Sequence, residues 1–173
     1  MATPRPDLKI EPLGAHHDRD GFSCGADSLD RYLRTQAGQD VRRKANGVFV
    51  LIEQGKPKVV LGYYTLSATG LPPGDIPLAA RKHIPRYPLV AATLLGRLAV
   101  SAARQGERLG AVLLADAVRR AYASASSVGS LMLVVDAISE RAVAFYEGNG
   151  FVRLPDSMRL ILPMYVIEKM MKP

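Results

Sequence analysis

The sequence predicts an α/β fold in which a mixed sheet carries helices on both of its faces. Segments with the two-residue period of strands alternate along the chain with segments of helical period. Two successive strands are separated by a short turn, which predicts an antiparallel hairpin. A later strand is almost wholly apolar, which is typical of a sheet centre covered on both sides. No shift in composition marks a boundary, so residues 1–173 are expected to form a single domain.

The chain opens with a predicted strand and a predicted amphipathic helix. Residues 7–13 alternate in polarity and are expected to form the strand. Ser23 or Asp27 can cap the helix, which is expected to run to about Lys44. One stripe of this helix is apolar and should face the core; its members recur at i, i+4 spacing and are Leu29, Leu33, Ala37 and Val41.

A hairpin and a long loop follow the helix. Val48–Glu53 and Lys58–Ala68 are the two strands that the intervening turn should pair antiparallel. Gly70–Pro88 then breaks the pattern because it contains five prolines, and its centre, Leu78–His83, is expected to form a short helix. A loop of this length in a compact domain is usually functional or mobile.

The second half of the chain alternates strands and helices. The long helix is apolar at spacings of three and four residues, and a serine side chain can cap the short helix. The expected elements are a strand over Thr93–Val100, a helix over Gly106–Ala125, a strand over Leu131–Asp136, a helix over Ser139–Glu147, a strand over Phe151–Leu154 and a final strand over 159–170.

Charge is the most informative bulk property of the chain. Lys and Arg number 23 against 16 Asp and Glu, which gives a formal net charge of +7 and a pI of about 9.8. A cofactor with several phosphates accounts for part of such an excess, and a polyanionic substrate such as nucleic acid accounts for more. The alternative is a merely basic protein without an anionic ligand.

Other bulk features favour the cytoplasm. Cys24 is the one cysteine in the sequence, so neither an internal disulfide nor a cysteine-rich metal site can form. The apolar stretches are strand-length and interrupted by polar residues, so no membrane span is expected. Residues 1–6 lack the apolar core of a signal peptide. His16 and His17 are expected to lie in a turn, and no metal site is predicted.

The strand-to-helix turn at Arg104–Ala111 carries the chemistry. Gly106 and Gly110 lie where the long helix should begin, and the first backbone N–H groups of a helix have no partner within it. The helix dipole adds partial positive charge there, so a phosphate can bind these amides if no side chain blocks it. Arg104 and Arg108 add charge nearby. The alternative is a helix start with two packing glycines.

A second motif, Phe145-Tyr146-Glu147 followed by Gly150-Phe151, closes the short helix. Together with Gln105-Gly106-Glu107-Arg108-Leu109-Gly110, it resembles the GNAT family of acyl-CoA N-acetyltransferases. In that family the pattern Gln/Arg-x-x-Gly-x-Gly/Ala holds the CoA pyrophosphate. Arg108 departs from the pattern because it stands where the middle glycine is usual, so its side chain must avoid or join the phosphates.

The resemblance covers nearly the whole chain and points to one branch of the family. The further segments similar to the GNAT-type toxins of bacterial toxin–antitoxin pairs are Phe22–Leu33, Leu61–Leu66, Ile84–Pro88 and Leu95–Val100. Members of that branch acetylate the α-amine of aminoacyl-tRNA and so arrest translation. The resemblance therefore implies acetyl-CoA as cofactor, aminoacyl-tRNA as substrate, a homodimer and a small ribbon-helix-helix antitoxin. Ser101 stands where that branch usually has an aspartate.

The resemblance also implies a fold and site residues. A GNAT sheet is mixed and mostly antiparallel, and its two central parallel strands, here residues 97–100 and 131–136, splay apart for CoA. The backbones of Leu98 and Val100 would pair with the pantetheine arm. Tyr146 would protonate the leaving thiolate as general acid. Without the resemblance, the interpretation of Tyr146 is a tyrosine that packs at the end of a helix. The implied cofactor-binding residues are Leu98, Ala99, Val100, Arg104, Gln105, Gly106, Glu107, Arg108, Leu109, Gly110, Ala111, Ser139 and Phe145.

Two basic clusters are candidates for contact with the RNA: Arg42, Arg43 and Lys44 in the first, and Arg81, Lys82 and Arg86 in the second. Phosphate contacts from such residues position RNA without reading its sequence. The alternative is a solvated helix face and a polar loop.

The sequence offers no obvious general base. An α-amine titrates at about 7.7–8.0, against about 10.4 for lysine, so an aminoacyl ester needs little help to lose its proton. Asp136 and Glu140 lie close to the site in sequence, but solvation or capping explains them equally well. Two other functions stay open: a GNAT acetyltransferase acting on a protein or small-molecule amine, and a non-catalytic acyl-CoA-binding module.

Overall fold

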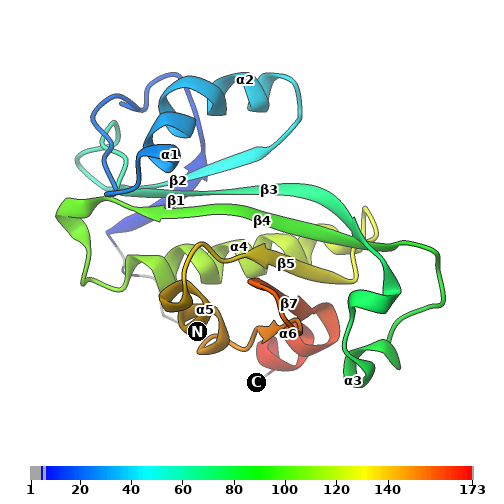
Figure 1. Cartoon of the computed structure of the whole chain (residues 1–173). Helices are drawn as coiled ribbons and strands as arrows, with labels where there is room; N and C mark the ends of the chain where they lie inside the picture. The colour runs from blue at the N-terminus through cyan, green and yellow to red at the C-terminus, as the bar shows by residue number, and fades with distance from the viewer. Residues whose placement is uncertain (1–4, 6, 173) are drawn as a thin grey trace. The chain divides into compact units, whose positions relative to one another are not determined.

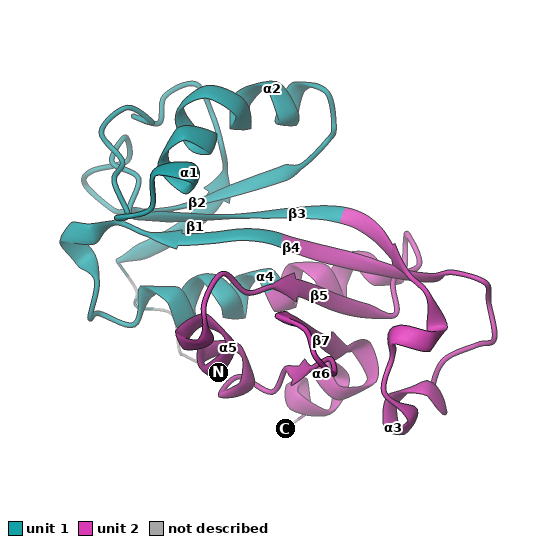
Figure 2. Ribbon diagram, viewed as in Figure 1, with its two compact units in different colours: residues 1–67, 96–117 teal, residues 68–95, 118–173 magenta. Residues whose placement is uncertain are grey.

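The computed structural model describes residue 5 and residues 7–172, and the chain forms two compact units (Figure 2). Unit 1 comprises residues 1–67 and 96–117, and unit 2 comprises residues 68–95 and 118–173. The strands β3 (Gly62–Leu71) and β4 (Val90–Val100) and the helix α4 (Leu109–Ala125) contribute residues to both units. Residues 1–4 and 6, on which most of the signal-peptide prediction rests, lie outside the described residues.

The sheet is mixed, as the sequence predicts. In the described part of the chain it has seven strands in the order β1-β2-β3-β4-β5-β7-β6 (Figure 1). The remaining strands are β1 (Leu8–Pro12), β2 (Gly47–Glu53), β5 (Met132–Asp136), β6 (Val152–Arg153) and β7 (Arg159–Pro163). The β2–β3 hairpin is antiparallel and β4 pairs parallel with β5, so both predictions are confirmed. The splaying of β4 and β5 stays a prediction.

The first helical segment of unit 1 is continuous but irregular. It consists of α1 (Asp27–Arg31), a π-helical turn η1 (Tyr32–Gln36) and α2 (Ala37–Arg42). The predicted cap is wrong, because Ala26 occupies the N-cap position without a side-chain hydrogen bond. Asp30 instead accepts a hydrogen bond from the backbone N–H of Cys24 at 2.9 Å, which ties the preceding loop to the helix.

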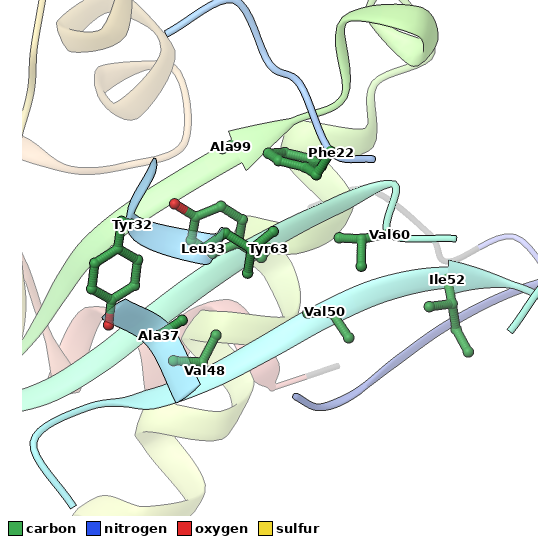
Figure 3. Close-up of a cluster of buried hydrophobic side chains, with 10 residues drawn as sticks. All are labelled: Phe22, Tyr32, Leu33, Ala37, Val48, Val50, Ile52, Val60, Tyr63 and Ala99. Carbon is green, nitrogen blue, oxygen red and sulfur yellow. The ribbon is translucent and has the colours of Figure 1, made fainter. Parts of the chain in front are cut away.

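The predicted apolar stripe of this helix is confirmed. Leu33 and Ala37 are fully buried in the core of unit 1 (Figure 3). Leu29 and Val41 are partly buried and pack against this core. The buried members of this core are Phe22, Tyr32, Leu33, Ala37, Val48, Val50, Ile52, Val60, Tyr63 and Ala99. The core therefore lies between the α1–α2 segment and one face of the strands of unit 1.

Two adjacent tyrosines of β3 show that helices cover both faces of the sheet in unit 1. The Tyr63 hydroxyl donates to the carbonyl of Leu29 at 2.6 Å, and the Tyr64 hydroxyl donates to the Asp116 carboxylate at 2.5 Å. Successive residues of a strand point to opposite faces. Since Leu29 belongs to α1 and Asp116 to α4, these two helices cover opposite faces.

The start of β3 differs from the prediction. The backbone makes two successive turns after β2, in which Lys56 N–H donates to Glu53 and Val59 N–H donates to Lys56. These turns use the residues that were expected to extend the strand, so β3 begins at Gly62 rather than at Lys58.

Unit 2 has its own core and four short helical elements among the described residues: η2 (Pro73–Asp75), α3 (Leu78–Arg81), α5 (Glu140–Glu147) and α6 (Met164–Met171). The buried residues of this core are Leu71, Ile76, Ala80, Val90, Ala92, Met132, Val134, Leu154 and Ile161. The predicted short helix in the long loop is thereby confirmed. Within the described chain, no helix has the length and apolar character needed to cross a membrane.

The predicted final strand over 159–170 is wrong beyond its first half. The strand β7 ends at Pro163, which stands at the N-cap of α6. Proline has no N–H to donate to a sheet ladder, and its fixed φ suits the start of a helix. Ile167 is the buried residue of α6, whereas Glu168 and Lys169 are exposed, which is the pattern of an amphipathic helix.

Candidate functional site

The candidate cofactor turn joins β4 to α4 and contains two residues in the left-handed backbone region. A short 3₁₀ turn η3 (Ala102–Arg104) follows β4. Gly106 then has a φ of 88° and Arg108 a φ of 60°. A right-handed helix does not include such residues, so α4 begins at Leu109 and not at Gly106 as predicted.

The backbone at Arg108 gives a physical reason for the glycine that the GNAT pattern has at this position. Left-handed φ values are nearly free for glycine but cost a residue with a Cβ. Arg108 adopts this conformation with its side chain exposed, while its carbonyl accepts the first helical hydrogen bond from Val112 at 3.3 Å. The departure from the family pattern therefore keeps the turn geometry and adds an exposed cation.

The turn fits an anionic ligand that binds through backbone amides. No heavy atom lies within 4 Å of the position that a Cβ would occupy at Gly106. The N–H groups of Leu109–Ala111 open α4, where helical geometry gives them no partner within the helix. Open space beside free amides and the positive end of a 17-residue helix suits a pyrophosphate group.

The guanidinium of Arg104 is already paired with carboxylates. It donates to both oxygens of Glu107, at 2.6 and 3.1 Å, and to Glu53 at 3.2 Å. The hydrogen bonds from Arg104, with a smaller contribution from Arg5 at 3.3 Å, lower the pKa of Glu107. The predicted role of Arg104 in adding charge for phosphates is therefore opposed by two nearby carboxylates.

The side chain of Gln105 connects three segments of unit 1. Its amide donates to the carbonyl of Cys24 at 3.1 Å and to the carbonyl of Val100 at 3.3 Å. Ala99 is buried in the core of the unit, while Leu98 and Val100 are half-buried at the end of β4. Of the residues expected to contact the cofactor, Ala99 can thus offer only its backbone.

The helix α5 of unit 2 carries the candidate general acid. It begins as predicted, with the Ser139 hydroxyl accepting from the N–H of Ala142 at 3.1 Å, so this hydroxyl is engaged in capping. Tyr146 is 7% exposed, and its ring packs edge-on against Phe145 and Phe151, with centroids 5.1 and 5.4 Å away. The aromatic residues therefore fix the orientation of the Tyr146 ring.

The Tyr146 hydroxyl has properties that suit a proton donor. Burial raises its pKa to about 12, so the group stays protonated at neutral pH. No residue in the described part of the chain hydrogen-bonds to this hydroxyl, in contrast to the hydroxyls of Tyr63 and Tyr64. Its proton is therefore available to a bound ligand.

The two carboxylates near α5 are paired with arginines of the β6–β7 hairpin. Arg159 donates to both oxygens of Asp136, at 2.7 and 2.9 Å, and these bonds lower the pKa of Asp136. Arg153 donates to both oxygens of Glu140, at 2.9 and 3.0 Å. A carboxylate with a lowered pKa is a poor proton acceptor at neutral pH, so this geometry argues against Asp136 as general base.

The two basic clusters lie in different units. Arg42, Arg43 and Lys44 are exposed at the end of α2 in unit 1, and Lys82 and Arg86 are exposed in unit 2. Arg81 is partly engaged, because it donates to the carbonyl oxygens of Ile76 at 2.9 Å and Gly74 at 3.3 Å. These bonds hold the loop that precedes α3.

Glu11, His16 and His17 form the one group of three potential metal ligands found among the described residues. The Nδ1 of His17 accepts from the N–H of Gly14 at 2.9 Å, so its Nε2 must carry the proton that it donates to Glu11 at 2.8 Å. A nitrogen that carries a proton has no lone pair for a metal. The observed hydrogen bonds therefore describe a structural cluster that anchors the loop after β1.

The sequence did not reveal the ion-pair partners of Arg104, Asp136 and Glu140. The pairing of Arg104 with Glu107 could have been predicted from their spacing in the sequence, because side chains at i and i+3 can meet around a turn. The ion pairs of Glu53, Arg153 and Arg159 could not be predicted in this way, because each residue reaches its partner only through the folded sheet.

No family model matches the chain. A curated relative from Mycobacterium tuberculosis, named tRNA-acetylating toxin, is 36% identical over 148 residues, which cover 85% of this chain and 86% of that protein. The chain belongs to this family of GNAT toxins.

Solved structures of the GNAT toxins KacT and AtaT resemble the chain over nearly its full length. A tyrosine-to-phenylalanine variant of KacT has a TM-score of 0.88 and 31% identity, covering 95% of this chain and 99% of that one. AtaT in complex with acetyl-methionyl-tRNAfMet has a TM-score of 0.88 and 32% identity, covering 96% and 100%. AtaTR bound to AcCoA has a TM-score of 0.83 and 31% identity, covering 97% and 100%. The GNAT fold predicted from the sequence is therefore confirmed.

Proposed function

We propose that the whole chain is one acetyl-CoA-dependent N-acetyltransferase domain, a toxin that acetylates the α-amine of aminoacyl-tRNA and blocks translation. The observation that carries this proposal is the full-length likeness to AtaT, whose structure was solved with acetyl-methionyl-tRNAfMet. The name of the relative from Mycobacterium tuberculosis supports the same acceptor.

Acetyl-CoA, which supplies an activated acetyl thioester, would be held through its phosphates by the turn Arg104–Ala111. The free amides at the start of α4 and the open space at Gly106 support this role. The ion pairs of Arg104 with Glu53 and Glu107 would fix the shape of the turn, leaving Arg108 as the side chain able to reach the pyrophosphate. The backbones of Leu98 and Val100 would hold the pantetheine arm.

Tyr146 would act as the general acid that protonates the leaving thiolate. Its raised pKa, fixed ring and unbonded hydroxyl support this role. The pairing of Asp136 with Arg159 supports a reaction without a dedicated carboxylate base. Such a reaction suits an α-amine, which is largely neutral near physiological pH.

The partners of the chain follow from the same relatives. Solved complexes of AtaT with the antitoxin AtaR and of KacTA with DNA support an antitoxin partner for this chain. We expect this antitoxin to be of the ribbon-helix-helix type, the toxin to be a homodimer, and both to act in the cytoplasm, where charged tRNA is found.

Incubation of the purified chain with radiolabelled acetyl-CoA and total charged tRNA tests the proposed activity. The expected product is N-acetyl-aminoacyl-tRNA, and deacylated tRNA serves as the control that should take up no label. Label on proteins or polyamines but not on charged tRNA would favour another acceptor. Binding of acetyl-CoA without transfer to any acceptor would leave a non-catalytic module.

A further inference from the structure

The loop between α3 and β4 presents a tyrosine to solvent on a constrained turn. Tyr87 is 60% exposed, and its backbone N–H donates to the carbonyl of Pro85 at 3.0 Å, which closes a three-residue turn. Pro85 is the first residue of the turn and Pro88 follows it, and both prolines restrict its backbone. The side chains of Arg86 and Tyr87 are therefore held outward by a segment with little conformational freedom.

The Tyr87 ring takes no part in the ring stacking that other aromatic residues show. No other ring or cation contacts it in the described residues, whereas Tyr32, Tyr63, Tyr64 and Tyr146 all pack against aromatic rings. Exposing a large aromatic side chain contributes nothing to folding. Its placement on a constrained turn therefore points to a ligand.

The surroundings of Tyr87 in the sequence carry positive charge without any acidic residue. No Asp or Glu occurs between Asp75 and Glu107. Lys82 and Arg86 are exposed and form no ion pair within the described part of the chain. An exposed aromatic ring beside free cations has the chemistry of a site for single-stranded nucleic acid, where bases stack on rings and phosphates meet cations.

We propose that Tyr87 and Arg86 form a stacking platform for the unpaired 3′ end of the acceptor RNA, with Tyr87 under a base and Arg86 at a phosphate. This inference rests on the proposed function, because an aminoacyl-tRNA carries its reactive amine on a single-stranded end. It adds an acceptor-positioning residue, Tyr87, that contacts RNA and not the reacting atoms.

Binding of fluorescent deacylated tRNA to Tyr87→Ala, Tyr87→Phe and Leu89→Ala tests the platform. Loss of one base stack should weaken binding by about 5- to 150-fold in Tyr87→Ala, while Tyr87→Phe, which keeps a ring, should bind like the wild type. Leu89 is a matched control, because it lies two residues away and is also 60% exposed. Leu89→Ala should leave RNA binding unchanged.

A second acceptor separates this inference from the proposed function. An amino acid methyl ester has the α-amine but no RNA, so Tyr87→Ala should acetylate it at the wild-type rate while losing kcat/KM for aminoacyl-tRNA. Wild-type RNA binding by Tyr87→Ala would overturn the platform. Equal losses of RNA affinity in Tyr87→Ala and Leu89→Ala, or a changed oligomeric state in either variant, would instead assign the loop to a protein interface. If the wild type binds RNA through Tyr87 but acetylates neither acceptor, the proposed function fails and the platform stands.

Discussion

Arg104 in unit 1 and Tyr146 in unit 2, the two polar side chains central to the candidate site residues, differ in whether they already have partners. In unit 1 the Arg104 guanidinium of the candidate cofactor turn is held by Glu53 and Glu107, and the turn offers backbone amides. In unit 2 the hydroxyl of Tyr146 has no partner among the described residues, and Lys82 forms no ion pair there. The Arg104 guanidinium is therefore held in place by ion pairs, whereas the Tyr146 hydroxyl and the Lys82 ammonium are available to a ligand.

This difference indicates a division of work in which the turn of unit 1 binds the cofactor and groups of unit 2 act in proton transfer and RNA binding. A preformed turn of amides can hold the constant part of a cofactor without side-chain rearrangement. A free hydroxyl and free cations can act on a ligand that arrives later. Substitutions in the turn of unit 1 should therefore change the affinity for acetyl-CoA, and substitutions in unit 2 should change turnover or RNA binding.

The largest expected effect is that of Tyr146→Phe, which should lower kcat by about 10²–10⁴-fold, the usual contribution of a general acid. Because the hydroxyl makes no hydrogen bond to described residues, its loss should leave folding and acetyl-CoA affinity unchanged. Steady-state kinetics and calorimetric titration measure the two quantities. Tyr122→Phe, at a half-buried tyrosine of α4 in the same unit, is the control, and equal turnover in both variants would remove the assigned role.

The next largest effect is expected from Gly106→Ala in unit 1. Its Cβ would enter the open space beside the amides, and loss of one charge-assisted hydrogen bond weakens acetyl-CoA binding by at least about tenfold. Gly55→Ala is a matched control, because Gly55 has a φ of 89° against 88° for Gly106 and equally open surroundings, but lies in the β2–β3 connection. Both variants should lose similar stability, and equal acetyl-CoA affinities would contradict the turn as the cofactor site.

The pH dependence of kcat/KM should have no descending limb from Tyr146 below about pH 11. A general acid must be protonated, and burial raises the pKa of this hydroxyl to about 12, so it remains protonated throughout the working range. Activity should rise as the acceptor amine loses its proton and then level off. A fall centred near pH 10 that disappears in Tyr146→Phe would show that the hydroxyl titrates as an exposed phenol.

The smallest expected effect is that of Arg108→Gly. Removing a Cβ from a residue with φ of 60° relieves strain and should raise the free energy of unfolding by up to about 1 kcal/mol in urea titrations. Lys44→Gly is the comparison, because Lys44 has a φ of 63° and lies at the end of α2. Weaker acetyl-CoA binding in Arg108→Gly alone would assign the Arg108 side chain to the phosphates, and unchanged binding would assign it to solvent.

Most elements of the fold could be predicted from the sequence, because the spacing of apolar residues and the positions of glycine and proline determine them locally. The Leu33 and Ala37 stripe and the Ser139 cap followed from spacing alone. The start of α4 was missed because the left-handed φ of Arg108 contradicts the usual preference of arginine. The end of β7 was missed because a short apolar run fits both a strand and an amphipathic helix. Pro163, which begins the helix, is the residue that distinguishes the two.

The candidate site was less predictable than the fold. The motif residues could be named from the sequence, but their partners could not. Arg104 was expected to contribute free charge, and only the folded hairpin brings Glu53 within 3.2 Å of it. Asp136 had no sequence signal for its pairing with Arg159, since β5 and β7 meet only through the order of strands in the sheet.

Single-turnover acetylation of aminoacyl-tRNA at increasing acetyl-CoA concentration tests the division of work most directly. The wild type, Gly106→Ala and Tyr146→Phe would be compared under the same conditions. We predict that saturating acetyl-CoA restores the rate of Gly106→Ala to near the wild-type rate and leaves Tyr146→Phe at least about 100-fold slower. Recovery of Tyr146→Phe at saturation, or a persistent defect of Gly106→Ala, would contradict the assignment of cofactor binding to the turn and of proton transfer to Tyr146.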